Sequence, residues 1–190
     1  REEVPVLKTG LRDFDDRIEG LDPNEGTLIL LCGEPGAGKT ILWSQMCFHM
    51  ATQKPGGLFS LEMKSRRMMY RAFSSMTDTS SWKMRKGFVN QNELSALAQE
   101  ADNLKDLPLY VADPGHLDTG TLHTMLYRYK RDYGLEWFGL DYLTLLRDDQ
   151  QLKKWERAEI LSQRLLQINR DLNLASVVIH TLNGEGKISG

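Results

Sequence analysis

The sequence predicts an α/β domain in which a mainly parallel central sheet is flanked by helices. Short apolar segments typical of buried strands alternate with longer segments of helical periodicity along the chain. A glycine-rich turn of the kind that cradles phosphate joins the first strand to a helix. The chain has 190 residues, about the length of one domain, so residues 1–190 are expected to form a single unit.

The first part of the chain predicts a helix, a strand and a second helix. Apolar residues recur every three or four positions from Leu11 to Leu21, as in a short helix that stops near Gly20. The segment Thr27–Cys32 has the apolar character and length of a buried strand. After the glycine-rich turn, a helix is expected from about residue 39 to residue 51.

The middle of the chain continues this alternation. Leu58–Ser60 predicts a second strand and Leu109–Ala112 predicts a third. Between them, two segments predict helices, Ser65–Met76 and Asn92–Leu104. The first of these helices can turn four apolar side chains to one side, namely Met68, Met69, Phe73 and Met76.

The last part adds two helices and two strands. Thr119–Tyr133 predicts a helix whose buried stripe consists of Leu122, Met125, Leu126, Tyr129 and Tyr133. Trp137–Asp141 predicts a short strand that ends in an acid, and apolar residues from Leu152 to Leu172 trace one face of a long helix. Ala175–Ile179 predicts the last strand. Five strands alternating with helices favour an open parallel sheet.

Composition excludes several classes of protein. The 24 Lys and Arg residues against 26 Asp and Glu give a net charge of −2, so any binding to DNA must come from local loops. The longest apolar run is far shorter than the roughly 20 residues that cross a membrane, and residues 1–3 open no signal peptide. Cys32 and Cys47 lack zinc-ligand spacing, so two buried thiols in a reducing, cytoplasmic compartment are expected.

The glycine-rich turn is the most specific motif in the chain. It matches the phosphate-loop pattern G-x-x-x-x-G-K-[ST] at every required position, from Gly33 through Glu34, Pro35, Gly36, Ala37, Gly38 and Lys39 to Thr40. Glycines let backbone N–H groups turn toward an anion, and the helix that follows adds its positive dipole end. Lys39 can reach the β- and γ-phosphates, the Thr40 hydroxyl can bind Mg²⁺, and Ile41 borders the site. The motif predicts ATP and Mg²⁺ as ligands.

Two acids follow strands of the predicted sheet. Asp141 ends its strand at the edge where parallel sheets bind ligands, so it can hold Mg²⁺ directly or through water. The alternative is a helix cap or a solvated loop acid. Glu62 lies two residues after the second strand, where a carboxylate can deprotonate an attacking water. Its alternative is an exposed glutamate at a helix start.

Four segments carry a family resemblance that spans nearly the whole chain. They are Thr9-Gly10-Leu11-Arg12-Asp13-Phe14-Asp15, Phe59-Ser60-Leu61-Glu62-Met63, Asp106-Leu107-Pro108-Leu109-Tyr110, and Tyr133-Gly134-Leu135 followed by Leu140-Asp141-Tyr142-Leu143. Together they resemble the RecA-like motor domain of DnaB-type replicative helicases of bacteria and phages. The resemblance implies a RecA-like P-loop NTPase fold. It also implies that Glu62 is the catalytic carboxylate and that Asp141 belongs to the Walker B element.

The chain departs from the family pattern in three places. Where the family has a glutamine that senses the γ-phosphate, this chain has Thr181 with His180 beside it, and either side chain is a candidate for that role. The Gly-Glu-Pro-Gly phosphate loop is nearer to that of RadA or KaiC proteins. The resemblance implies that the strands with the family's arginine finger would follow Gly190, and that the domain that contacts primase would precede residue 1, so the sequence is expected to be either a truncated piece or a natural chain whose end is not given.

Candidate DNA contacts lie in the loops after two strands. Arg147, Lys153 and Lys154 follow the Walker B strand, and Lys187 follows the last one. The resemblance implies that such loops line the central channel of a ring, where few cations per subunit would give sequence-independent, salt-sensitive contact. The basic residues of the helix after Glu62, which are Arg66, Arg67 and Arg71, are expected on a solvated face.

These observations predict an ATP-dependent helicase motor that translocates on single-stranded DNA. The resemblance implies a homo-oligomer, expected to be a hexameric ring, with a primase or a helicase loader as further partner and no membrane contact. The setting is the cytoplasm of a bacterial cell or a phage-infected host. Because a neighbouring subunit would supply the arginine finger, the isolated chain is expected to hydrolyse ATP slowly. The alternative is a RadA- or KaiC-like recombination or regulatory ATPase without unwinding activity.

Overall fold

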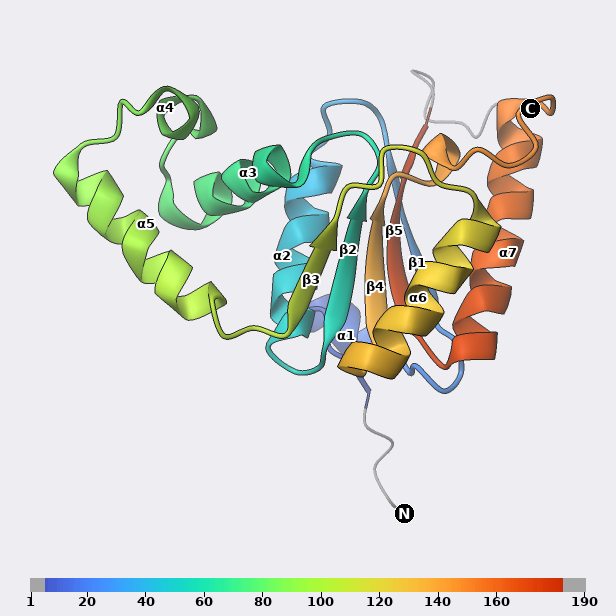
Figure 1. Cartoon of the computed structure of the whole chain (residues 1–190). Helices are drawn as coiled ribbons and strands as arrows, with labels where there is room; N and C mark the ends of the chain where they lie inside the picture. The colour runs from blue at the N-terminus through green and yellow to red at the C-terminus, as the bar shows by residue number, and fades with distance from the viewer. Residues whose placement is uncertain (1–5, 183–190) are drawn as a thin grey trace, which may run out of the picture.

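A computed structural model describes residues 6–182 and contains a five-stranded sheet in which all neighbouring strands are parallel (Figure 1). The order of the strands across the sheet is β1-β5-β4-β2-β3. Their bounds are Leu28–Gly33 for β1, Gly56–Ser60 for β2, Leu109–Ala112 for β3, Trp137–Asp141 for β4 and Ala175–Thr181 for β5. The predicted α/β class and the five predicted strands are confirmed.

Helices cover both faces of the sheet (Figure 1). One apolar cluster joins α2 (Lys39–Ala51) and the start of α3 (Ser65–Thr77) to one face, close to α1 (Arg12–Ile18). The other cluster joins α6 (Thr119–Tyr133), the short 3₁₀ helix η1 (Leu143–Leu145) and α7 (Lys154–Leu172) to the opposite face. Both clusters exclude water from the middle strands, since β2 and β4 are buried along their whole length.

Three helices between β2 and β3 form an arm that extends beyond the β3 edge of the sheet (Figure 1). After α3 come α4 (Ser81–Lys86) and α5 (Gln91–Leu104). A capping box fixes the start of α5, because Asn90 and Glu93 each accept the other's backbone N–H. Helix α4 was not predicted from the sequence, since its six residues are too few to show a helical period.

Helix α2 lies unusually close to β4, because Gly139 has no side chain. A Cβ atom at this position would stand 2.7 Å from the Trp43 ring and 2.9 Å from the Cys47 sulfur. The Trp43 indole N–H also donates to the Val177 carbonyl oxygen at 2.9 Å, deep in β5. These contacts fix the helix that begins at the phosphate loop against the central strands.

Several sequence expectations need correction. Leu21 is not helical but pairs with Leu7 in an isolated antiparallel bridge after α1 ends. Cys32 is exposed, because β1 is an edge strand of the sheet, whereas Cys47 is buried as expected. Tyr133 is 48% exposed rather than buried, although its ring stacks on Tyr110 with centroids 4.3 Å apart.

Candidate functional site

The phosphate loop lies at the carboxyl end of β1, between Gly33 and the first residue of α2. Gly36 and Gly38 have φ angles of +81° and +83°, which other residues adopt only with strain. The Lys39 ammonium lies across the loop and donates to the carbonyl oxygens of Gly33 at 2.8 Å and Glu34 at 2.7 Å. The loop therefore has the turned backbone and the nearby cation that phosphate binding requires.

A cavity of about 670 Å³ opens beside this loop. Six of the predicted phosphate-loop residues line it, namely Pro35, Gly36, Gly38, Lys39, Thr40 and Ile41. Gly33, Glu34 and Ala37 shape the loop without lining the cavity. Glu62, Asp141 and Thr181 line it from the ends of three other strands. The structure thus brings together residues that lie far apart in the sequence.

Glu62 and Asp141 follow neighbouring strands. Ser60 of β2 is in register with Asp141 of β4, and the Leu61 N–H donates to the Asp141 carbonyl oxygen at 2.8 Å. This hydrogen bond extends the pairing of β2 and β4 by one residue, so that Glu62, the next residue, lies close to Asp141 just beyond the end of the sheet. Glu62 is exposed, as a base that must reach water should be.

Asp141 is buried, with 1% of its surface exposed, and one of its carboxylate oxygens has no hydrogen-bond partner. Burial raises the pKa of Asp141 to about 6, and repulsion from the Glu62 carboxylate adds to the shift. Arg71, the Thr40 hydroxyl and Lys39 act against this rise. A buried carboxylate oxygen without a partner fits a divalent cation, which would supply the missing positive charge.

The chemistry of these side chains fits Mg²⁺ better than a transition metal. Within residues 6–182, no group of three or more His, Cys, Asp or Glu side chains is placed to hold a metal ion. Mg²⁺ needs few protein ligands, since phosphate oxygens and water complete its coordination. The Thr40 hydroxyl and the Asp141 carboxylate, which both line the cavity, would suit that role.

Arg71 is a residue that sequence reasoning missed. It is exposed on α3, as expected, but it also lines the cavity together with Glu62 and Asp141. Its charge is close enough to Asp141 to lower the pKa of that carboxyl. Only the way α3 packs on the sheet places Arg71 here, and no motif in the sequence marked it.

Thr181 and His180 face opposite sides of β5, as consecutive strand residues do. Thr181 is in register with Gly33 of the phosphate loop and lines the cavity. His180 is 7% exposed, and its Nδ1 atom has no hydrogen-bond partner. Burial lowers the pKa of His180, and Lys39 lowers it further. Of the two candidates for the phosphate sensor, Thr181 is the one among the lining residues.

The predicted DNA residues of the Walker B loop are exposed. Arg147 follows η1, and its Nη2 atom lies 2.9 Å from His116 Nε2 in the loop before α6. Lys153 and Lys154 are exposed at the start of α7. Lys187 lies outside the described residues.

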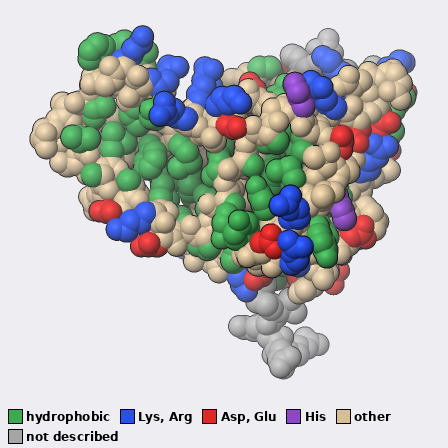
Figure 2. All heavy atoms as spheres, in the orientation of Figure 1, with side chains coloured by type: hydrophobic (Ala, Val, Ile, Leu, Met, Phe, Trp, Pro, Cys, Tyr) green, Lys and Arg blue, Asp and Glu red, His purple; other side chains and the backbone are tan. Residues whose placement is uncertain are grey.

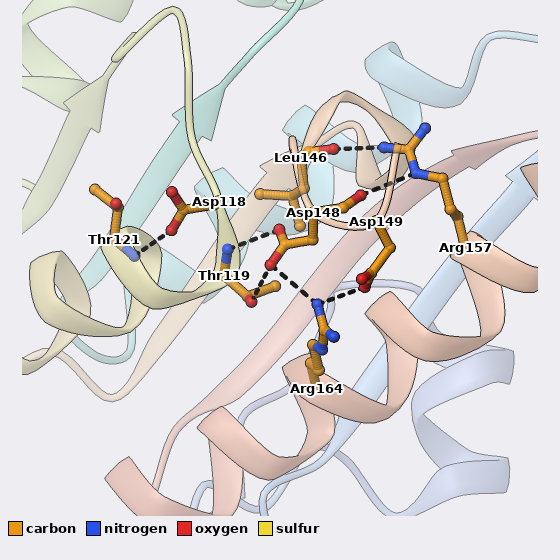
Figure 3. Close-up of polar contacts among 8 residues, drawn as sticks. All are labelled: Asp118, Thr119, Thr121, Leu146, Asp148, Asp149, Arg157 and Arg164. Carbon is orange, nitrogen blue, oxygen red and sulfur yellow. Dashed lines mark hydrogen bonds and ion pairs between the residues drawn. The ribbon is translucent and has the colours of Figure 1, made fainter. Parts of the chain in front are cut away.

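Two arginines of α7 fix the segment that carries Arg147 (Figure 3). Arg157 donates to three backbone carbonyl oxygens, those of Leu146 at 2.6 Å, Asp148 at 3.1 Å and Thr144 at 3.3 Å. Arg164 lies 3.1 Å from the Asp148 carboxylate and 2.7 Å from that of Asp149. The segment after the Walker B strand is therefore tied to α7 at several points.

The same segment is also tied to α6. The Asp148 carboxylate accepts the Thr119 hydroxyl at 2.6 Å and the Thr119 N–H at 2.9 Å, at the first residue of that helix (Figure 3). One acid thus joins two helices that cover the same face of the sheet. We name the contacts of Asp148, Arg157 and Arg164 the loop clamp.

Comparison with known proteins gives consistent results. The family model described as DnaB-like helicase C terminal domain matches residues 6–186. The replicative DNA helicase DnaB of Rickettsia prowazekii is 28% identical over 190 residues, which cover 93% of this chain and 39% of that protein. The DnaB of Buchnera aphidicola subsp. Baizongia pistaciae is 27% identical over 186 residues, with coverages of 95% and 40%.

Two solved structures have a similar fold. One is described as a DnaB-like replicative helicase and its interactions with primase, with a TM-score of 0.83 at 17% identity, covering 96% of this chain and 44% of that one. The other is described as an ATPase domain, with a TM-score of 0.84 at 17% identity, covering 96% of this chain and 66% of that one. At such identity they support the fold alone, and they confirm the predicted RecA-like arrangement.

The chain spans about two fifths of the length of the curated relatives described above. No helix in the described part of the chain combines the length and the apolar character that a membrane span requires.

Proposed function

Because the chain belongs to the DnaB-like helicase C-terminal domain family, we propose that it is the motor domain of a replicative DNA helicase. In this function it hydrolyses ATP and translocates on single-stranded DNA as part of a ring. The observation that carries the proposal is the convergence of the phosphate loop, Glu62 and Asp141 on one cavity. A recombination or regulatory ATPase of the RadA or KaiC kind is not favoured, because the matching family and the curated relatives are replicative helicases.

Several residues that line the cavity have a chemical task in this proposal. The backbone N–H groups of the phosphate loop and the Lys39 ammonium hold the β- and γ-phosphates. Thr40 and Asp141 would hold Mg²⁺, and the ion would supply positive charge against the charge that develops on the phosphate oxygens. Glu62 orients a water molecule and accepts its proton, while Arg71 and Thr181 border the γ-phosphate position.

The remaining parts of the proposal concern partners. Neighbouring subunits form a ring, expected to be a hexamer, and each supplies an arginine to the ATP of the next. Arg147, Lys153, Lys154 and Lys187 contact DNA phosphates inside the ring. A primase or a helicase loader binds the full protein, and the cytoplasm of a bacterium or a phage-infected cell is the setting.

The test is the ATPase rate of the full-length protein with and without single-stranded DNA. Strong stimulation by DNA is expected, with turnover abolished in both Lys39→Ala and Glu62→Gln. Lys105→Ala and Asp102→Asn, which change exposed residues at the far end of α5, are the matched controls and should keep the rate. ATP-dependent assembly with no response to DNA would refute the motor and support a regulatory ATPase.

A further inference from the structure

The arm between β2 and β3 carries an unusual concentration of positive charge. Residues 64–87 contain seven Lys and Arg residues and one acid, Asp78, in a chain whose net charge is −2. Figure 2 shows Lys and Arg side chains gathered along the upper rim of the molecule, from α4 across α3 toward the top of the sheet. So strong a local charge creates a field that attracts polyanions.

Most of this charge is not neutralised within the described part of the chain. Lys64 lies 3.8 Å from the Asp113 carboxylate, and Lys83 pairs with Glu93 at 2.6 Å. Among residues 6–182, no ion pair is found for the exposed side chains of Arg66, Arg67, Arg85 and Lys86. These cations are therefore available to an anionic ligand.

Two aromatic rings lie exposed beside the cations of α4. Trp82 is 50% exposed and Phe88 is 65% exposed, with their ring centroids 5.6 Å apart. The backbone fixes this pair, since Gly87 ends α4 with a φ of +75° and the Phe88 N–H returns to the Lys83 carbonyl oxygen at 3.0 Å. A contact made only to close the helix would not need to leave both rings so accessible to solvent.

Exposed aromatic rings among uncompensated cations are the combination that binds single-stranded nucleic acid without sequence preference. Bases stack on the rings, and the cations contact the phosphates. We propose that Trp82, Phe88, Arg85 and Lys86, continued by Arg66 and Arg67 of α3, form a binding surface for single-stranded DNA. We name it the arm surface. It is separate from the loops after β4 and β5.

The position of the arm surface agrees with this ligand. Strands β2 and β4 end at the top of the sheet in Figure 1, where α4 also lies, so the arm surface and the Arg147 loop share one end of the molecule. The two lie at opposite sides of this end, and the basic side chains along the upper rim in Figure 2 lie between them. The proposal rests on the proposed function only for the identity of the ligand.

Binding of a fluorescein-labelled oligothymidine, followed by anisotropy at several salt concentrations, tests the proposal on the 190-residue chain. The double variant Arg85→Glu/Lys86→Glu is expected to weaken binding about tenfold or more at low salt. Each lost phosphate contact should also flatten the slope of log K against log salt by about 0.7. The matched control is Arg12→Glu/Arg17→Glu, which makes the same charge change at two exposed positions of α1. It should leave binding unchanged.

The aromatic pair has a different expected signature. Trp82→Ala should weaken binding about tenfold without changing the salt slope, and Trp82→Phe should restore most of the affinity. DNA should quench the fluorescence of Trp82, and this quenching should disappear in Trp82→Phe. If Trp82 served only the fold, its loss would disturb the nearby cations as well, so both the affinity and its dependence on salt would change.

Other outcomes would overturn the arm surface. If the α4 double variant binds like the α1 control, the cations do not contact DNA. If Trp82→Ala changes only the oligomeric state, the rings belong to a protein interface. ATPase measurements separate the two proposals. If Arg147→Glu loses the DNA stimulation of ATP hydrolysis while the α4 double variant keeps both DNA binding and stimulation, the motor function is supported and the arm surface is refuted. If the α4 double variant weakens DNA binding but DNA never stimulates hydrolysis in the unchanged protein, the arm surface is supported and the motor function is refuted.

Discussion

Asp141 is a single carboxyl group whose burial costs the protein stability at neutral pH. Its folded pKa of about 6 lies above the value of about 3.9 expected in an unfolded chain. Above pH 6 the folded protein must therefore hold a charge that the unfolded chain accommodates more easily, and below about pH 4 the difference vanishes. We expect Asp141→Asn to stabilise the nucleotide-free protein by about 2–3 kcal/mol at about pH 8, and by about half as much at about pH 5.

Urea unfolding at the two pH values measures this effect. Asp102→Asn, which removes an exposed acid from α5, is the control and should show no such dependence on pH. An equal gain in the free energy of unfolding at both pH values would mean that the charge of Asp141 does not destabilise the folded protein. The same substitution should abolish ATP hydrolysis, so the group that weakens the fold is one that the proposed reaction needs.

Arg71 gives a second prediction at the scale of the residue. Because its cation borders the cavity beside Glu62 and Asp141, we expect Arg71→Ala to lower the turnover number for ATP by about tenfold or more. Arg71→Lys should recover part of the rate. Arg12→Ala, which removes an exposed arginine from α1, is the matched control. Steady-state kinetics that place the whole loss in KM would contradict a role in stabilising developing charge.

At the scale of the element, the loop clamp connects α6, α7 and the segment after the Walker B strand. Three carbonyl oxygens depend on one guanidinium group, so Arg157→Ala leaves them without a donor. We expect this variant to need a higher concentration of single-stranded DNA for half-maximal ATPase stimulation, by about tenfold, while the KM for ATP stays the same. The variant should also lose about 2–3 kcal/mol of stability.

The control for the clamp is Arg128→Ala, which removes an exposed arginine from α6. Asp148→Asn tests the contacts of the Asp148 carboxylate, because it keeps the shape of the side chain and removes its charge. If both clamp variants lower stability but leave the DNA response unchanged, the clamp serves only the fold.

At the scale of the whole molecule, the proposed ring makes ATP hydrolysis depend on contacts between subunits. We expect the isolated 190-residue chain to hydrolyse ATP slowly, since an arginine from a neighbouring subunit is worth about 10³ to 10⁵ in rate. Turnover measured beside sedimentation velocity checks this expectation. Rapid hydrolysis by a chain that sediments as a monomer would contradict it, and a rate that rises steeply with protein concentration would support it.

The same scale explains what the sequence could and could not predict. The phosphate loop and the positions of Glu62 and Asp141 follow from local patterns, because strand ends in a parallel sheet meet at one edge. The exposure of Cys32 depends on β1 being an edge strand, and strand order is set by packing between distant segments. The position of Arg71 beside the cavity and the formation of the short helix α4 likewise depend on how the helices of the arm pack together.

The missing side chain of Gly139 has a consequence for how the sequence can change over time. Since α2 rests against this glycine through Trp43 and Cys47, a larger residue at position 139 requires a smaller one at position 43 or 47. Natural variants should therefore change these positions as a set. A lineage that acquires one change alone would shift the start of α2 and, with it, the phosphate loop.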